Sequence, residues 1–320
     1  NGASGYSNGG TNLRGAGGGG AGGSIQLAAV SMNITGTVSA DGGAGGKGYS
    51  AGNADQSGGG GGGGRIVLSY SSIAPWIGHR LYYGDSSPPA RFGFYGLMFS
   101  GVHAYGAASS GVSSYYLFGG AGTVMGIIDG VPRLLNIANA NGAWSSDKFR
   151  TDLTTDIYSA EHSSVQLYVQ SQSYVRFYHS SLAFKRINIG NRSWAGFSTM
   201  HMNTTSSISV SEDVSVYQAT LTSGSPLSLQ AQTLGVQEGK LTTTTTSSTG
   251  LTVNLTGVGP RPSYVGRGGW IEALSSSLKL QAANQDLSVY MGNINSKSST
   301  SLEFKRISLS YCDVSCRNVG

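Results

Sequence analysis

The sequence predicts an all-β protein, in which a glycine-rich, β-helix-like N-terminal segment is followed by two tandem β-sandwich or jelly-roll-like domains. Three observations lead to this fold class. Glycine is concentrated at the start of the chain, where 25 of the 51 glycines precede Arg65. Short runs that alternate polar and apolar residues recur along the rest of the chain. One set of strand residues also returns 120 positions later.

Composition supports a folded protein and argues against two classes of partner. Only 11% of the 320 residues are charged, 38% are hydrophobic, and the net charge is +5. Disordered chains instead combine low hydrophobicity with high net charge. The basic residues do not form the like-charge blocks of nucleic-acid-binding tails, and no apolar run approaches the length of a membrane span. We therefore expect neither a nucleic-acid partner nor a membrane span.

Residues 1–72 form the first predicted segment. Between Ser24 and Ala40 the apolar residues fall on every second position, with one slip between Ala29 and Met32. Two strands joined by a corner and flanked by glycine are typical of one coil of a parallel β-helix. The glycine tracts would then be corners or strands. Two alternatives are a bundle of extended polyglycine helices, because residues without Cβ let backbones approach closely, and a flexible linker.

This pattern of strand, glycine run and the strand RIVLSY at 65–70 resembles the glycine-rich repeat segments of large secreted cell-surface and adhesin-like proteins. The resemblance covers residues 15–70. It implies an extracellular, repetitive protein with a structural or adhesive role, and it implies no particular partner. The chain also begins without an initiating Met, which we interpret as a mature or excised piece of a longer secreted polypeptide.

Residues 73–198 and 199–320 are predicted to be two β-sandwich domains. A proline-rich stretch at 73–91 marks the first boundary. The second domain is predicted from an internal repeat, because two strand-like segments 120 residues apart share the element F-K-R-I. The matching residues are Leu167, Val169, Ser181, Leu182, Phe184, Lys185, Arg186 and Ile187, which return as Leu287, Val289, Ser301, Leu302, Phe304, Lys305, Arg306 and Ile307.

Two kinds of covalent modification are predicted. Cys312 and Cys316 lack the further ligands of a metal site, so we expect a disulfide, either with each other or with a partner, in an oxidising compartment. Four N-x-S/T sequons could carry N-linked glycans. They are Asn33, Asn191, Asn203 and Asn254.

No motif in the sequence carries an enzymatic signature. The G-x-S-x-G strings lie in glycine-rich text without the strand and helix of a nucleophile elbow, and the histidines are scattered. We predict no catalytic residue, metal or cofactor. Aromatic residues remain as candidates for stacking on sugars or filling a subunit interface, although they could equally pack in a core. The chosen aromatics are Tyr95, Tyr105, Tyr115 and Tyr116.

The function expected from these features is structural. Few charges and unpaired strand edges favour pairing between copies. The chain is therefore predicted to be a subunit of an extracellular, glycosylated filament, sheath or surface appendage. Residues 1–72 would dock into the next subunit. The alternative is a monomeric carbohydrate-binding adhesin or lectin-like module.

Overall fold

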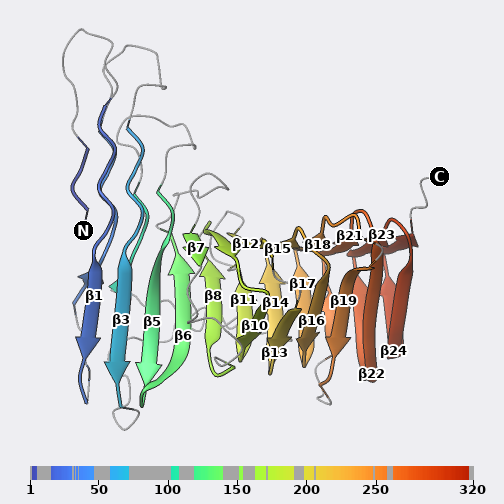
Figure 1. Ribbon diagram of the computed structural model, residues 1–320. Coiled ribbons are helices and arrows are strands. Elements are labelled where there is room, and N and C mark those ends of the chain that lie inside the picture. The colour runs from blue at the N-terminus through green and yellow to red at the C-terminus, as the bar shows by residue number, and fades with distance from the viewer. Residues whose placement is uncertain are drawn as a thin grey trace. The chain divides into compact units, whose positions relative to one another are not determined.

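In the computed structural model most of the described residues lie in β-strands (Figure 1). The described residues are 2–5, 16–30, 32, 34, 36–46, 58–71, 102–107, 119–139, 151–153, 163–170, 172–190, 198–204, 207–247, 249–257 and 262–316. No α-helix occurs among them. The chain divides into two compact units. Unit 1 consists of residues 1–86, 95–151 and 168–174, and unit 2 of residues 87–94, 152–167 and 175–320.

Unit 1 contains four strands that pair in the order β1-β3-β5-β6. The first two pairings are parallel, whereas β5 and β6 form an antiparallel hairpin through Asp129 and Gly130, which both have positive φ. β2 and β4 pair with each other in a separate two-stranded sheet. The strands of unit 1 are β1 (Ser24–Ala28), β2 (Val38–Ser39), β3 (Arg65–Tyr70), β4 (Val102–His103), β5 (Gly122–Ile128) and β6 (Val131–Ala138). Three strands contain residues of both units, namely β7 (Thr151–Leu153), β8 (Gln166–Gln170) and β9 (Tyr174–Phe177).

A bundle of extended glycine segments forms the other part of unit 1. Its segments are linked by backbone hydrogen bonds that recur every third residue. The N–H groups of Gly19 and Gly22 donate to Gly59 and Gly62, and those of Gly43 and Gly46 donate to Gly20 and Gly17. Each segment thus bonds to neighbours on different sides, which is how polyglycine helices with three residues per turn associate. The second of the three sequence alternatives therefore describes these glycine tracts.

Close backbone packing explains why these residues are glycine. A Cβ placed on Gly61 would fall on the carbonyl oxygen of Gly20, and one on Gly58 would fall on that of Gly17. The strands beside the bundle supply an ordinary apolar core, in which Ile66 and Leu68 of β3 are fully buried. The glycine tracts therefore form the bundle because only residues without Cβ can pack this closely, and the period-two runs between the tracts form strands.

Unit 2 is a β-solenoid whose coils stack in parallel. Its strands are β10 (Ser181–Phe184), β11 (Arg186–Ile189), β12 (Ser198–Met202), β13 (Ser207–Val210), β14 (Asp213–Tyr217), β15 (Ala219–Ser223), β16 (Leu227–Ala231), β17 (Thr233–Gln237), β18 (Lys240–Thr243), β19 (Thr249–Leu255), β20 (Ser263–Val265), β21 (Trp270–Ala273), β22 (Ser277–Tyr290), β23 (Asn293–Ser296), β24 (Thr300–Ser310) and β25 (Asp313–Cys316).

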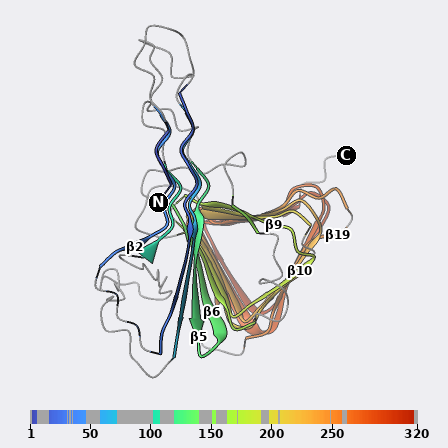
Figure 2. The same ribbon diagram turned by 60° about the vertical axis from the view of Figure 1, so that its left-hand side comes forward.

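Each coil contributes one strand to each of three walls. The first wall contains β10, β13, β16, β19 and the N-terminal halves of β22 and β24. The second contains β11, β14, β17, β20 and the C-terminal halves of β22 and β24. The third contains β12, β15, β18, β21, β23 and β25. Figure 2 shows the strands of each wall of unit 2 lying over one another.

Alternation along each strand places every second side chain in the solenoid interior. The parallel register then stacks similar residues of successive coils into apolar rows. In the first wall the row runs from Leu182 through Ile208, Leu229, Val253 and Leu280 to Leu302. In the third wall it runs through Met200, Leu221, Leu241, Ile271, Ile294 and Val314. All members before the last coil are buried.

A left-handed residue recurs at the corner between the second and third walls. In each coil it lies two residues before an outward-facing residue of the third wall, and Trp270 is that residue in the coil of β21. The corner residues are Gln218, Glu238, Gly268, Met291 and Tyr311, with φ between 45° and 62°. Only one of them is glycine, although residues with a Cβ pay about 1–2 kcal/mol for this conformation. Interlocking coils therefore impose the corner regardless of residue type.

The two tandem sandwich domains of the sequence prediction are not confirmed. Every described pairing from β10 to β25 joins strands of successive coils in parallel, whereas sandwiches and jelly rolls are antiparallel. The repeat of 120 residues has another basis. Leu182 and Leu302 stand in the same apolar row five coils apart, so the repeat relates equivalent positions of one solenoid. The predicted division at residues 72 and 198 stays a prediction.

Candidate functional site

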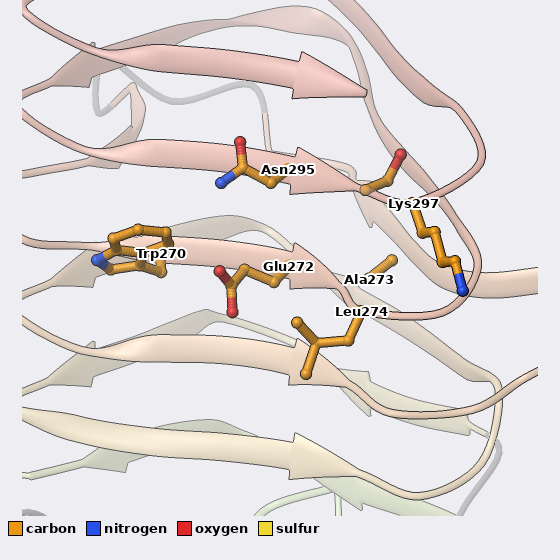
Figure 3. A pocket seen from close by; sticks show the side chains of 7 residues that line it. Trp270, Glu272, Ala273, Leu274, Asn295 and Lys297 are labelled. Carbon is orange, nitrogen blue, oxygen red and sulfur yellow. The ribbon is translucent and has the colours of Figure 1, made fainter. Parts of the chain in front are cut away.

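A groove on the outer surface of the third wall is the candidate binding site. It lies over β21 and β23 and the turns that follow them, and has a volume of about 390 Å³. Figure 3 shows Trp270 and Glu272 side by side on β21, with Asn295 on the neighbouring strand. The groove is lined by Trp270, Glu272, Ala273, Leu274, Asn295, Ser296 and Lys297. Its size is within the range of small-ligand sites, which are mostly apolar with a few placed polar groups.

The regular strand geometry places these side chains together. Trp270 and Glu272 are two residues apart on β21, so both point outward while Ile271 points into the core. Asn295 lies directly opposite Glu272 in the parallel register of β21 and β23. Because neighbouring strands lie about 4.8 Å apart, an aromatic ring, a carboxylate and a carboxamide occupy one patch.

Lys240 organises the charges of the groove from the adjacent strand β18. Its Nζ lies 3.4 Å from Oε2 of Glu272 and 5.5 Å from the centroid of the Trp270 ring. The carboxylate is nearly buried, with 10% of its side chain exposed, whereas the lysine is 47% exposed. The ammonium group therefore neutralises Glu272 from the edge of the groove. The carboxylate and the Trp270 ring line the bottom of the groove.

A second cluster gathers polar side chains in unit 1 around Asp41. The Ser39 hydroxyl donates to Oδ2 at 2.7 Å, Nδ1 of His103 lies 2.8 Å from Oδ1, and the Tyr105 backbone N–H donates to Oδ1 at 2.7 Å. The rings of His103 and Tyr105 stack with their centroids 4.5 Å apart. The carboxylate thus ties together the two chain segments that carry β2 and β4.

The Asp41 cluster does not have the order of a serine hydrolase triad. In a triad the serine hydroxyl bonds to the histidine, which bonds in turn to the carboxylate. Here the Ser39 hydroxyl donates to Asp41 itself. Ser39 and His103 lie opposite each other in the β2–β4 register, so both bond to the same carboxylate from neighbouring strands. The arrangement suits a structural clasp between β2 and β4.

Tyr105 gives the Asp41 cluster a testable pH dependence. Burial, and secondly the Asp41 charge, raise the pKa of Tyr105 above its usual value. The folded state holds the phenol proton to higher pH than the unfolded chain, so this stability is complete below about pH 10 and is lost as pH rises through the raised pKa. We expect Tyr105→Phe, which keeps the stacked ring, to lose less thermal stability than wild type between about pH 9 and pH 11.

Melting curves followed by circular dichroism across this pH range measure the effect. Tyr290→Phe is the matched control, because Tyr290 is an exposed tyrosine outside the cluster. Equal alkaline destabilisation of wild type and Tyr105→Phe would show that the clasp does not respond to this proton.

Of the four aromatic residues chosen from the sequence, Tyr105 is the one that lies among the residues the structure describes. It lies in the Asp41 cluster and is partly buried. Tyr95, Tyr115 and Tyr116 lie outside the described residues. The structure therefore does not place the four tyrosines in one site.

The predicted modification sites have different settings. Asn33 and Asn191 lie outside the described residues. Asn203 follows β12 in a bend and is partly buried. Asn254 lies within β19 between Gln230 and Gln281 of the adjacent coils, and its Oδ1 is buried. Asn203 is thus the more loop-like of the two described acceptors.

The predicted disulfide involves the end of the solenoid. Cys312 is partly buried and lies between β24 and β25. The side chain of Cys316, the last residue of β25, lies outside the described side chains. A disulfide of either cysteine therefore stays a prediction.

The last coil of the solenoid is uncovered. Leu287 and Val289 of β22 are 3% and 1% exposed, but their partners in β24, Ile307 and Leu309, are 40% and 51% exposed. The inward residues of earlier coils are buried because another coil follows them. Among the described residues no further coil stacks on β24 and β25, so these apolar side chains and the strand edge are exposed in the structure.

Comparison with known proteins identifies no relative, because no family model, curated protein or solved structure matches the chain. Within the described ranges no three His, Cys, Asp or Glu side chains gather in a way that could hold a metal ion. No helix in the described part of the chain is long and apolar enough to cross a membrane. The function must therefore be argued from the two described surfaces, the groove and the open edge.

The sequence did not single out the residues of the groove. Trp270 is isolated from the aromatic-rich stretch at 82–118, and Glu272 belongs to no dense acidic group. The available signal was the pattern W-I-E, which puts an aromatic ring and a carboxylate on the same side of a strand whose intervening residue is apolar. The Asp41 to His103 pair had no comparable signal, since 62 residues separate its members.

Proposed function

We propose that this chain is a structural subunit of an extracellular, glycosylated filament, sheath or surface appendage, and that copies assemble by pairing of strand edges. The observation that carries this proposal is the uncovered last coil of unit 2. Long exposed edges with apolar side chains are sites at which another chain adds a strand.

The backbone of β24 offers hydrogen-bonding groups to an added strand. In a parallel pair, every second residue bonds to the partner strand and the residues between them face away. The N–H of Met291 donates to the carbonyl of Ser310, so Ser310 bonds towards β22. The N–H groups of Ile307 and Leu309 consequently point to the open edge. A strand added there would satisfy these groups and cover the two apolar side chains.

A second edge of the same kind occurs in unit 1. Among the described strands β1 pairs with β3 alone, through hydrogen bonds that include Arg65 N–H to Gly23 and Ala29 N–H to Ser69. The alternation of the parallel ladder turns the N–H groups of Ser24, Gln26 and Ala28 to the other side. We propose that β24 of one copy pairs with β1 of the next, because two different edges joined head to tail generate an open filament.

This proposal narrows the docking element expected from the sequence. Residues 1–72 as a whole were expected to dock, but β3 supplies Ile66 and Leu68 to the core of unit 1. Deleting the whole segment would remove that core, so loss of assembly would not report docking alone. Substitutions on the strand edges are the sharper test.

Leu309→Lys tests assembly at the β24 edge. A lysine there places a charge on the open coil, which is a device that natural sheets use to prevent edge pairing. We expect at least a tenfold weaker self-association, equivalent to about 1.4 kcal/mol. Sedimentation velocity over a concentration series measures the association, and negative-stain electron microscopy shows the assembled form.

Leu274→Lys is the matched control, because Leu274 is also 51% exposed but lies in the turn after β21. It should associate like wild type. Wild-type chains that remain monomers of 32.9 kDa at every concentration would overturn the proposal. Equal effects of the two lysines would remove β24 as the contact.

The alternative function, a monomeric carbohydrate-binding adhesin or lectin-like module, is favoured by a different observation. The groove combines a tryptophan with a carboxylate and a carboxamide, which is the chemistry of sugar recognition, and its described lining includes none of the four tyrosines chosen from the sequence. Monomers that bind a glycan would support this alternative. An enzymatic role is not proposed, because neither described cluster has a catalytic arrangement.

A further inference from the structure

We propose that the groove over β21 and β23 binds a pyranose unit of a glycan. In this site Trp270 is the platform for the sugar ring, and Glu272 and Asn295 bind its hydroxyl groups. The proposal stands independently of filament assembly, because the groove lies on the outer surface of the third wall and the assembly contacts are strand edges.

Trp270 has the exposure and surroundings of a stacking platform. It stands on the outward row of the third wall, between Lys240 and Asn293, and is partly exposed. Core packing does not require a ring at this position, since the neighbouring coils carry polar residues there. An indole face presents a large rigid apolar surface at low cost in conformational entropy. The apolar C–H face of a pyranose ring is a matching surface.

Glu272 retains capacity to accept hydrogen bonds from a ligand. An ionised carboxylate has about four acceptor positions on its two oxygens. The ion pair with Lys240 engages Oε2 at 3.4 Å. The side chain is nearly buried at the bottom of the groove, so a ligand hydroxyl donating to Glu272 would bond in an environment with little competing water.

Asn295 supplies the complementary donor. Its Oδ1 accepts a hydrogen bond from the Ser315 hydroxyl at 2.8 Å, which fixes the orientation of the amide and leaves Nδ2 as its donor group. Glu272 and Asn295 lie opposite each other on adjacent strands, about 4.8 Å apart. Each hydroxyl of a sugar can both donate and accept, so two neighbouring hydroxyls can bridge this acceptor and this donor.

Thr242 adds an unsatisfied polar group beside the same carboxylate. It lies opposite Glu272 on β18 and is 6% exposed. Its hydroxyl has no hydrogen-bond partner within the described part of the chain. Buried hydroxyls are normally paired, so this side of Glu272 also offers hydrogen-bonding capacity.

The outer surface of the third wall suits an extended, hydroxyl-rich polymer better than a nucleic acid or a helical peptide. The outward rows of the third wall alternate with the core rows and are mostly hydroxyl and amide residues. One row is Thr199, Thr220, Lys240, Trp270, Asn293 and Asp313, and the other is His201, Thr222, Thr242, Glu272, Asn295 and Ser315. Besides His201 the two rows contain one basic residue, Lys240, and two acidic residues, Glu272 and Asp313, so they lack the basic stripe of a nucleic-acid interface. A glycan chain could follow these rows from coil to coil.

Affinity electrophoresis and calorimetric titration of the full chain test the proposal. The probes are dextran and galactomannan as neutral polymers, and alginate and hyaluronan as acidic ones. We expect Trp270→Ala to weaken binding at least tenfold, which corresponds to about 1.4 kcal/mol. Trp270→Phe should retain part of the affinity, and Glu272→Gln should weaken it severalfold.

Tyr311→Ala is the matched control, because Tyr311 is an exposed aromatic residue of the same unit that lies outside the groove. It should bind like wild type. Binding of a neutral or an acidic polymer supports the site and identifies its sugar class, since only the acidic interaction should weaken steeply with salt. Failure of all four polymers to bind, or binding that survives Trp270→Ala, overturns it.

The same measurement on Leu309→Lys separates this proposal from the proposed function. That variant changes the β24 edge and leaves every residue of the groove in place. Loss of assembly with retained glycan binding supports both proposals. Wild-type chains that assemble but bind no glycan would overturn the proposal about the groove and leave the proposal about assembly in place.

Discussion

Gly61→Ala is expected to destabilise unit 1 by about 3 kcal/mol, at the upper end of the cost of overpacking. The new methyl group would fall on the carbonyl oxygen of Gly20, which belongs to a neighbouring backbone and not to a flexible side chain. The segment could accept it only by moving away. Gly61 also donates its N–H to Gly43 and accepts a hydrogen bond from Ala107, so this movement would break bonds on more than one side.

Gly59→Ala is the control for Gly61→Ala within the same segment. A Cβ at Gly59 has no atom within 4 Å. Its substitution should therefore change stability by no more than about 0.5 kcal/mol. Hydrogen exchange followed by mass spectrometry on peptides from residues 16–23 and 58–64 reads the bundle directly. Equal protection in the two variants would show that these glycine segments do not pack as closely as described.

Phe184→Ala is expected to destabilise unit 2 by about 3–5 kcal/mol, the usual loss for a fully buried phenylalanine. Phe184 has no exposed surface and meets Phe177 edge to face, with 6.1 Å between ring centroids. Truncation would leave a cavity beside the Phe177 ring and the next coil, in which Val210 lies opposite Phe184. Urea denaturation at a concentration at which the chain is monomeric measures the free energy of unfolding.

Phe304→Ala is the matched substitution for Phe184→Ala. Phe304 is the residue that corresponds to Phe184 in the 120-residue repeat, but it belongs to the uncovered last coil and is only partly buried. We expect it to cost less than half as much in the monomer. Under assembling conditions the same substitution should weaken association, since a second copy would cover this ring. Equal losses in the monomer would mean that the last coil is as well covered as the first.

The sequence allowed the class of strand structure to be predicted but misplaced the solenoid. Alternation correctly indicated β-structure, and the glycine tracts suggested a β-helix at the N-terminus. The parallel coils instead occupy the chain from β10 onwards. Their period is hidden because the turns differ in length: Trp270 follows its row partner Lys240 by 30 residues, whereas Asp313 follows Asn293 by 20. Only the spacing between Leu182 and Leu302 happened to align several coil positions at once.

The candidate site was harder to predict because its residues meet across strands. Lys240, Trp270 and Asn295 belong to three successive coils, and their proximity depends on the parallel register. In the sequence, the clustering of aromatic residues favoured the tyrosine-rich stretch as a binding site over the single tryptophan, Trp270. On a solenoid wall the relevant neighbours of a residue are one coil away, so local density in the sequence has little bearing on function.

The directions of the hydrogen bonds in the two units imply different mechanical behaviour. In unit 2 the bonds between strands join each coil to the coil before and the coil after it, so a pulling force along the stack can open the coils one at a time. A glycine segment of unit 1 bonds to several neighbours around its axis, as Gly19, Gly20 and Gly22 do with three different segments. Withdrawing one such segment requires many bonds to break together. We therefore expect the glycine bundle to resist a pulling force more strongly than the solenoid, whose coils can open one after another.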